Sequence, residues 1–193
     1  MTQMKQPEMA DPEEESSSQS TGQQSSERRK REVYGWIFSL LAAVVIALAL
    51  RLFVFEFIRV DGESMHPTLQ DEEYVFMERV TYWFSEPQHG DIIICHYPDS
   101  TDTYVKRVIG VGGDTLRVTN GVLYINGEAS FDYFSEPMNM EVAEITIPEG
   151  CVYVMGDNRN NSTDSRIVGA LPLDMVLGKA LFVIWPPENI GGL

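Results

Sequence analysis

The amino-acid sequence predicts a mostly β domain made of antiparallel sheets and preceded by one transmembrane helix. A long apolar segment without charged side chains lies near the N-terminus. It is followed by short segments rich in Val, Ile, Tyr and Phe and bounded by Gly, Pro, Asn or Asp, a pattern typical of strands and turns. No sustained helical period follows the apolar segment, and 193 residues leave room for about one domain.

Residues 1–32 are predicted to form a disordered tail on the cytoplasmic side of a membrane. The stretch "DPEEESSSQSTGQQSSE" is rich in Ser, Gln and Glu, so it cannot bury enough apolar surface to offset the entropy of the chain. The tail ends in the basic run "RRKR" at 28–31. Basic residues beside a membrane span favour the cytoplasm, so we expect the N-terminus to stay inside.

Residues 33–51 are predicted to form the transmembrane anchor. As a helix, the uncharged stretch "YGWIFSLLAAVVIALAL" covers about 25 Å, at the short end for a bilayer core, and the apolar sequence resumes as "LFVF" after Arg51. The alternative is a cleaved secretory signal, because "ALA" at 47–49 fits a small-x-small cleavage pattern. The acidic tail before the segment and the apolar residues after it favour a retained anchor. In both readings residues 52–193 are exported.

Residues 52–193 are predicted to form the β-rich domain. Asn-Gly pairs in "TNGV" and "INGE" predict tight hairpin turns. A weak helical pattern occurs at 171–177, and the apolar stretch "VTYWF" at 80–84 belongs either to the core or to a lip that rests on the bilayer. Strands are expected at 56–62, 73–84, 91–98, 103–111, 114–128, 144–157 and 179–186.

The composition argues against two classes of function. A net charge of −15 disfavours nucleic-acid binding, because phosphate neutralisation needs a basic patch that the domain lacks. The three histidines and two cysteines show no metal-ligand spacing, so neither a metal nor another cofactor is expected. The sequence leaves open whether Cys95 and Cys151 form a disulfide.

Ser64, in the stretch "GESMHPTLQD" at 62–71, is either a turn residue or a nucleophile. A nucleophilic serine needs a base nearby. His66 is only two residues away, and Pro67 fixes the next backbone torsion, so the imidazole is poorly placed to receive the Ser64 proton.

Lys106, in the stretch "TDTYVKRVIGVGGD", is a better candidate for the base. Strand alternation puts it on an apolar face with Tyr104 and Val108, while Arg107 lies on the other face, which is also apolar. Burial disfavours the ammonium form and lowers the lysine pKa, so the amine can take a proton from a serine hydroxyl. The alternative is that both basic residues lie at a strand edge and extend into solvent.

A polar loop, "GDNRNNSTDSR" at 156–166, follows the apolar strand "CVYVM". Such a loop must be held by side-chain hydrogen bonds. Its acidic and basic side chains can pair with one another and with Arg107, and Ser162 can hydrogen-bond a neutral amine. A purely structural loop is the alternative.

Together these stretches resemble the type I signal peptidases, or leader peptidases, which are membrane-anchored Ser/Lys proteases. Three family signatures occur in order behind the anchor: "SMHPTL", "YVKRVIGVGGD" and "GDNRNNSTDSR". The likeness covers nearly everything from Leu52 to the C-terminus. It implies a compact β domain of the signal-peptidase kind, in the single-anchor branch with Gly before the nucleophile.

The resemblance also implies roles for individual residues. Ser64 is expected to be the nucleophile, Lys106 the general base, and Ser162 the residue that orients the lysine. Ion pairs that brace the site are implied for Arg107, Asp157, Asp164 and Arg166. Shallow pockets for small substrate side chains are implied at Ile58, Val60, Met65, Leu69, Tyr104 and Val105.

The implied function is that of a serine endopeptidase in the bacterial cytoplasmic membrane, with its catalytic domain outside the cytoplasm. It would remove N-terminal signal peptides from exported preproteins after a small-x-small motif. The implied partners are those signal peptides, the lipid bilayer and the secretion translocon. An alternative of a different class is a membrane-tethered β domain that binds peptides or cell-envelope partners without catalysis.

Two positions depart from the family pattern. Many relatives have Ser or Thr two residues before the nucleophile, where its hydroxyl serves the oxyanion hole, and this chain has Gly62. The backbone N–H of Ser64 is then the one expected donor, and the second is unidentified. Asn160 stands where Asp is common.

Overall fold

The computed structural model describes residues 13–130 and 137–193. Its two compact units are Met1–Ala49 and Leu50–Leu193. Helix α1 spans Glu13–Phe53. Its segment Arg31–Arg51 is the one helical segment of the described chain that is long and apolar enough to cross a membrane. The helix begins within the tail that the sequence predicts to be disordered, since Glu, Gln, Arg and Lys favour helix and no proline interrupts 13–53. For residues 1–12, which lie outside the described part, disorder stays a prediction.

The unit Leu50–Leu193 consists mostly of antiparallel β-sheet, which confirms the predicted fold class. The larger sheet has the strand order β1-β2-β11-β3-β4-β9-β10, with β12 paired to β11. Its strands are β1 (Phe55–Arg59), β2 (Tyr74–Glu78), β3 (Ile92–His96), β4 (Thr103–Val111), β9 (Cys151–Met155), β10 (Leu171–Pro172), β11 (Val176–Trp185) and β12 (Gly191–Gly192).

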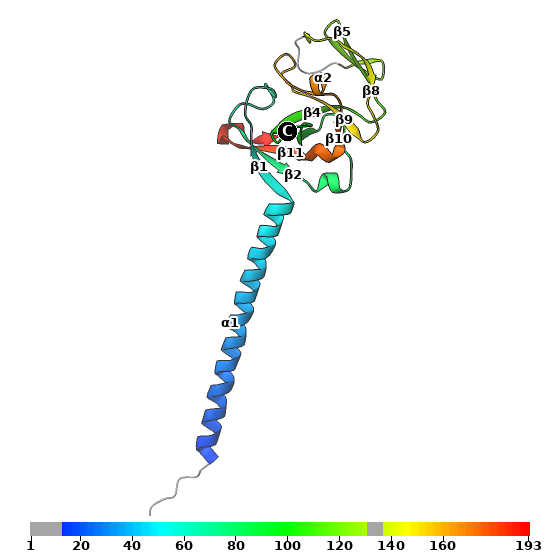
Figure 1. Cartoon of the computed structure of the whole chain (residues 1–193). Coiled ribbons are helices and arrows are strands. Elements are labelled where there is room, and N and C mark those ends of the chain that lie inside the picture. Colours follow the sequence, from blue (N-terminus) through cyan, green and yellow to red (C-terminus); the bar gives the residue numbers. More distant parts are fainter. Residues whose placement is uncertain (1–12, 131–136) are drawn as a thin grey trace, which may run out of the picture. The chain divides into compact units, whose positions relative to one another are not determined.

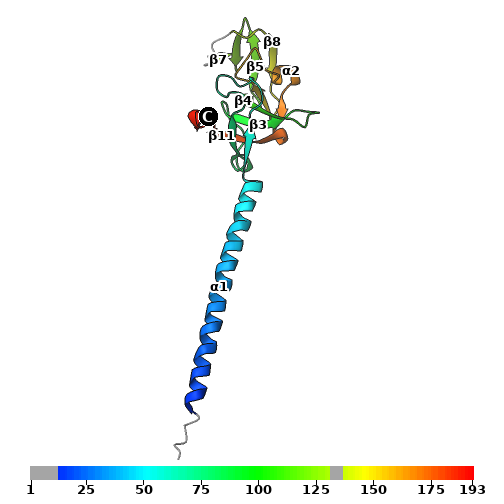
Figure 2. The same ribbon diagram turned by 90° about the vertical axis from the view of Figure 1, so that its left-hand side faces the viewer.

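The smaller sheet has four strands in the order β7-β6-β5-β8. They are β5 (Thr115–Thr119), β6 (Val122–Ile125), β7 (Glu128–Ser130) and β8 (Val142–Thr146). Asn120-Gly121 and Asn126-Gly127 form the turns of its two hairpins, and all four residues have positive φ as the Asn-Gly pattern predicts. In both views this sheet lies at the end of the domain remote from β1 and β2 (Figures 1 and 2).

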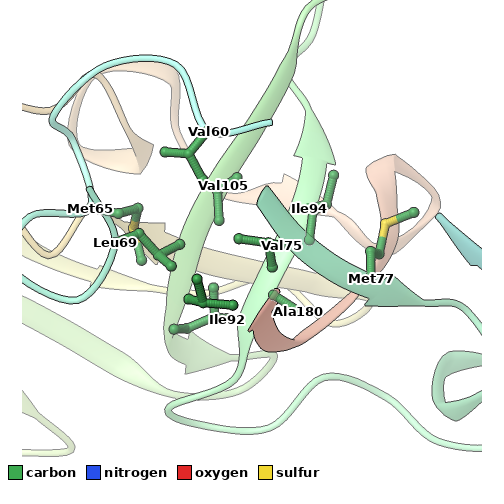
Figure 3. Close-up of a cluster of buried hydrophobic side chains, with 10 residues drawn as sticks. Val60, Met65, Leu69, Val75, Met77, Ile92, Ile94, Val105 and Ala180 are labelled. Carbon is green, nitrogen blue, oxygen red and sulfur yellow. The ribbon is translucent and has the colours of Figure 1, made fainter. Parts of the chain in front are cut away.

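Three buried clusters hold the domain together. The first, which we call the loop cluster, is shown in Figure 3 and contains Val60, Met65, Leu69, Val75, Met77, Ile92, Ile94, Val105, Ala180 and Val183. The second lies on the opposite face of β3 and includes Ile93 and Cys95. The third joins the smaller sheet to Ile109 and to Tyr153 and Met155 of β9. Strands β3 and β4 are therefore covered on both faces.

Several elements differ from their predicted form. The strand expected at 73–84 ends at Glu78, whose Oε2 accepts a hydrogen bond from Thr81 N (3.0 Å) and starts the 3₁₀ helix Thr81–Trp83. Trp83 and Phe84 are 56% and 85% exposed, so the core interpretation of "VTYWF" is wrong for these two. The weak helical pattern at 171–177 corresponds to β10 and the 3₁₀ helix Leu173–Met175. Other short helices are α2 (Ser165–Val168) and a 3₁₀ turn at Pro187–Asn189.

Candidate active site

Ser64 lies in the loop that connects β1 to β2. The base of this loop is closed by two backbone hydrogen bonds, from Val60 N to Glu73 O (2.7 Å) and from Glu72 N to Val60 O (3.0 Å). Met65 and Leu69 are buried and point into the loop cluster beside Val105 (Figure 3). Burial of these two side chains fixes the loop to the sheet and leaves Ser64 partly exposed.

Lys106 extends from the middle of β4 to Ser64. Its Nζ lies 2.7 Å from Ser64 Oγ and also donates to the carbonyl of Val105 (3.0 Å). The lysine is 3% exposed and pairs across the sheet with Ile93. The Nζ lies 5.9 Å from the ring centroid of Tyr104. By contrast, His66 is exposed, and its ring makes no hydrogen bond within the described part of the chain.

The protonation of Lys106 is governed chiefly by its burial. Removing the amine from water disfavours the ammonium form and lowers the pKa of Lys106 below its usual value. Negative charge at Asp164 and Asp157 opposes this effect without cancelling it. Burial also raises the pKa of the neighbouring Cys95 thiol to about 12. Burial therefore favours the neutral form of the amine that lies beside the Ser64 hydroxyl.

Arg107 is on the neighbouring position of β4 and forms a two-pronged ion pair with Asp157. Its Nε lies 2.8 Å from Asp157 Oδ1, and its Nη2 lies 2.7 Å from Oδ2. Its Nη1 donates to the carbonyl of Gly90 (2.9 Å). Since Asp157 begins the polar loop after β9, this pair fixes that loop to the strand that carries Lys106.

Asp164 and Arg166 form a second two-pronged ion pair, which is buried inside the polar loop. Both Nε–Oδ1 and Nη2–Oδ2 distances are 2.8 Å, and the side chains are 0% and 3% exposed. Asp164 also caps α2 and accepts a hydrogen bond from Gly156 N (3.0 Å). Burial alone raises the pKa of Asp164, but Arg166 and these hydrogen bonds outweigh it and hold the pKa below its usual value.

Ser162 lies in the same corner, but its hydroxyl does not bond to Lys106. Its Oγ is buried, and its interaction with Asp164 helps to hold the pKa of that carboxyl below its usual value, whereas Lys106 Nζ is bonded to Ser64 and Val105. Packing around it is tight, because a Cβ on Gly156 would collide with Ser162 Oγ and with the carbonyl of Ser64. The sequence therefore identified the corner, while the expected orienting contact is not formed here.

The candidate catalytic pair lines an open pocket of about 420 Å³. Three segments form its walls. They are the loop between β1 and β2 that carries Ser64, which we call the nucleophile loop, the middle of β4, and the polar loop. The lining residues are Asp61, Gly62, Glu63, Ser64, Tyr104, Lys106, Asn160, Asn161, Ser162 and Thr163.

Of the six residues expected to contact substrate, Tyr104 lines this pocket. The other five belong to the loop cluster or pack against it: Ile58, Val60, Met65, Leu69 and Val105. They lie beneath the nucleophile loop because their side chains are the apolar anchors of that loop and of β1 and β4. In this structure the pocket walls are polar, and sequence reasoning missed Asp61, Glu63, Asn161 and Thr163.

Asn158 is another residue that the sequence reasoning passed over. Its backbone N–H donates to Ser64 O (3.0 Å), and its side-chain Nδ2 donates to Glu63 O (3.1 Å). The polar loop thus holds the backbone of the nucleophile directly. An asparagine beside Asp157 in a turn-forming sequence was the available signal, but its partner is 95 residues away and not visible in the sequence.

The two cysteines are not joined in a disulfide, and the acidic side chains of the described residues do not gather into a metal site. Both thiols are free, because Cys95 and Cys151 pack in different clusters. Among residues 13–130 and 137–193, no three His, Cys, Asp or Glu side chains gather closely enough to share a metal ion.

The chain is similar to proteins of one known family. The family described as signal peptidase, peptidase S26, matches residues 33–185. A probable signal peptidase I-1 from Synechocystis sp. is 40% identical over 80% of this chain and 83% of its own length. A signal peptidase I from Bacillus licheniformis is 38% identical over 87% and 97%. A crystallised signal peptidase I from Enterococcus faecalis V583 matches with 30% identity and a TM-score of 0.45, over 49% of this chain and 97% of that one.

The family match spans the predicted anchor and all three wall segments of the pocket, and the relatives align over most of both chains. With a serine and a buried lysine in contact at the centre of that match, the chain belongs to the signal peptidase family, peptidase S26.

Proposed function

We propose that this protein is a membrane-anchored serine endopeptidase that removes N-terminal signal peptides from exported preproteins, with Ser64 as nucleophile and Lys106 as general base. The observation that carries the proposal is the 2.7 Å contact between Lys106 Nζ and Ser64 Oγ, with the lysine 3% exposed. A buried neutral amine at this distance can take up the hydroxyl proton. Among the described residues, His66 is the other basic side chain close to Ser64 in the sequence, and it is exposed and makes no hydrogen bond to the Ser64 hydroxyl, unlike Lys106.

The proposed reaction is acyl transfer in two steps. Neutral Lys106 accepts the Ser64 proton as Oγ attacks the carbonyl carbon of the scissile bond, and the oxyanion forms near the Ser64 N–H. Collapse breaks the C–N bond, and the lysine ammonium gives its proton to the leaving amine. Lys106 then deprotonates a water that hydrolyses the ester, which releases the signal peptide and restores Ser64.

The remaining site residues are proposed to support this pair. Arg107–Asp157 and Asp164–Arg166 hold the polar loop against β4 and the nucleophile loop. Ser162 is proposed to orient Lys106 once substrate displaces water from the pocket. The pocket beside Tyr104 is proposed to take the small residues of the small-x-small motif, and the buried loop cluster is proposed to support the nucleophile loop from beneath.

The membrane arrangement is part of the same proposal. Residues 33–51 span the cytoplasmic membrane, residues 1–32 stay in the cytoplasm behind the basic run, and residues 52–193 act outside it. Tethering raises the local concentration of signal peptides, which are themselves held in the bilayer, and the secretion translocon delivers them.

Mass spectrometry of a signal-bearing preprotein after incubation with the full chain tests the proposal. The wild type should cut after a small-x-small motif, and Ser64→Ala and Lys106→Met should each lower the rate by several orders of magnitude. Lys179→Met is the matched control, because it removes a half-buried lysine that pairs with Asp91 and not with Ser64. Cleavage by Ser64→Ala at the wild-type rate would overturn the mechanism.

A further inference from the structure

The nucleophile loop turns at Gly62, two residues before Ser64. This residue has φ +91°, a left-handed conformation that side chains rarely adopt. A Cβ there would meet nothing within 4 Å, so the backbone conformation, and not the available space, calls for glycine. Glycine is also the residue with the greatest backbone freedom. The conformation of Gly62 therefore directs the peptide groups that lead into the nucleophile.

Asp71 restrains Gly62 from the other limb of the loop. Gly62 N donates to Asp71 Oδ1 at 2.8 Å. The bond lies next to the backbone pair between Val60 and Glu72 at the base of the loop. The Asp71 carboxylate therefore joins the two ends of the loop at Gly62, the residue whose backbone has the fewest steric restrictions.

The carbonyl groups of Glu63 and Ser64 are held by the polar loop. Asn158 binds Glu63 O through Nδ2 and Ser64 O through its backbone N–H. Asp71 and Asn158 thus fix the two ends of the short segment that carries the nucleophile. Between these restraints, Ser64 N–H donates to no atom of the described chain. The Gly62 N–H is occupied by Asp71, whereas the Ser64 N–H, like those of Glu63 and Met65, has no acceptor among the described residues. Of these three amides, that of Ser64 belongs to the residue that carries Oγ.

We propose that Asp71 is a positioning residue for catalysis: it holds Gly62 in its left-handed conformation and thereby aims the Ser64 N–H at the oxyanion formed during peptide-bond cleavage. The inference rests on the proposed function of Ser64. Asp71 itself lies outside the pocket that Ser64 and Lys106 line, so it acts through Gly62 and touches no substrate. The required group is a hydrogen-bond acceptor at this position, and its negative charge is secondary.

The test compares Asp71→Ala, Asp71→Asn and Glu72→Ala in the full chain, with a signal-peptide substrate. Asp71→Ala removes the acceptor and should lower kcat about 10- to 100-fold with KM within about 3-fold, because the donor is misdirected and not deleted. Asp71→Asn keeps an acceptor oxygen and should stay within about 3-fold of the wild-type kcat. Glu72→Ala removes the adjacent exposed carboxylate, which pairs with Arg59, and should leave kcat unchanged.

A second measurement separates positioning from loss of structure. A peptide aldehyde forms a tetrahedral adduct with a serine, whereas an uncleavable substrate peptide reports ground-state binding only. Asp71→Ala should weaken the aldehyde by the same factor as kcat and leave the uncleavable peptide and the thermal midpoint unchanged. The inference is overturned by wild-type kcat in Asp71→Ala, or by an Asp71→Asn that folds but loses kcat. If the wild type shows no Ser64-dependent cleavage, the proposed function itself fails first.

Discussion

At the scale of single residues, the proposed mechanism makes the rate of cleavage depend on the protonation of Lys106. The proposed reactive form is the neutral amine, and burial lowers the pKa of Lys106 below the usual lysine value of about 10.4. The rate should therefore rise with pH as Lys106 loses its proton, and the rise in kcat/KM should be centred below the usual lysine pKa. A pH series of signal-peptide cleavage measures it.

Two results would contradict this expectation for Lys106. One is a rise centred at the ordinary lysine pKa, which would mean that the amine is solvated during catalysis. The other is a rise that moves in Lys179→Met, since Lys179 pairs with Asp91 and makes no hydrogen bond to Ser64 or Lys106 among the described residues.

Asp164 and Arg166 make a second prediction at this scale, about stability. Asp164→Ala leaves the Arg166 guanidinium, which is 3% exposed, without its buried partner, and should lower the free energy of unfolding by about 3–5 kcal/mol at pH 7. Because folding lowers the Asp164 pKa, the pair stabilises the protein above the unfolded-state pKa near 3.9. That stability is lost as the pH falls through the lower folded-state value.

Denaturant unfolding at pH 7 and at acid pH checks this prediction about Asp164. The difference between wild type and Asp164→Ala should shrink in acid. The matched control is Glu72→Ala, which breaks an exposed pair with Arg59 and should cost less than about 1 kcal/mol. Equal losses from the two variants at pH 7 would refute the role given to the buried pair.

Whether the sequence can identify a site residue depends on how far along the chain its contact partner lies. Ser64 and Lys106 stand out through local patterns, a serine in a turn and a lysine on an apolar strand face, and through the family signatures. Their contact joins positions 42 residues apart and depends on strand order. The hydrogen bonds made by Asp71 and Asn158 have no local pattern at all, because a polar residue in a loop is ordinary until its partner is known.

At the scale of elements, the polar loop is coupled to the chain that precedes β8 through Asn160. Its Oδ1 accepts from Asn139 N (2.8 Å), and its Nδ2 donates to Pro137 O (3.1 Å). An aspartate can make only the first of these bonds. Asn160→Ala should lose both and speed hydrogen exchange at the Asn139 amide about 10-fold, while Asn160→Asp should give a smaller effect.

Hydrogen-exchange mass spectrometry of the peptide around Asn139 measures this coupling. Asn161→Ala is the control, because the Asn161 side chain makes no hydrogen bond among the described residues and only its backbone N–H donates, to Asn158 O. Equal protection at Asn139 in Asn160→Ala and in the wild type would show that the two elements are independent.

Strand identity was more predictable than strand arrangement. Apolar alternation and Asn-Gly turns located most strands, because both are local properties of the chain. The insertion of β11 between β2 and β3, and the division into two sheets, depend on long-range pairing that no short pattern reports. The end of β2 at Glu78 was missed for a similar reason, since one carboxylate hydrogen bond to Thr81 N converts an apolar, strand-like sequence into a turn.

At the scale of the whole molecule, an exposed aromatic face accompanies the apolar helix. Phe55, Phe57, Phe76 and Phe182 form a cluster on one face of the larger sheet, with ring centroids 5.5–6.4 Å apart. Phe57 and Phe182 are half exposed, and Trp185 on the same strand as Phe182 is 56% exposed. Strand β1, which carries two of these rings, begins at Phe55, and α1 ends at Phe53. Exposure of these apolar rings to water is unfavourable, and contact with lipid would bury them.

The aromatic face predicts that the unit Leu50–Leu193 binds bilayers without the helix that precedes it. Neutral lipid is the appropriate partner, because this unit has more Asp and Glu than Lys and Arg and is repelled by anionic headgroups. Replacing Phe57 and Phe182 by Ser should weaken sedimentation with neutral vesicles at least about 10-fold, since each ring gives up buried apolar area. Met140→Ser is the control, because Met140 is 40% exposed and lies outside the aromatic cluster. Equal sedimentation of the unit Leu50–Leu193 with and without the two substitutions would show that the aromatic face does not bind the bilayer. The anchor alone would then hold the candidate catalytic pair at the membrane.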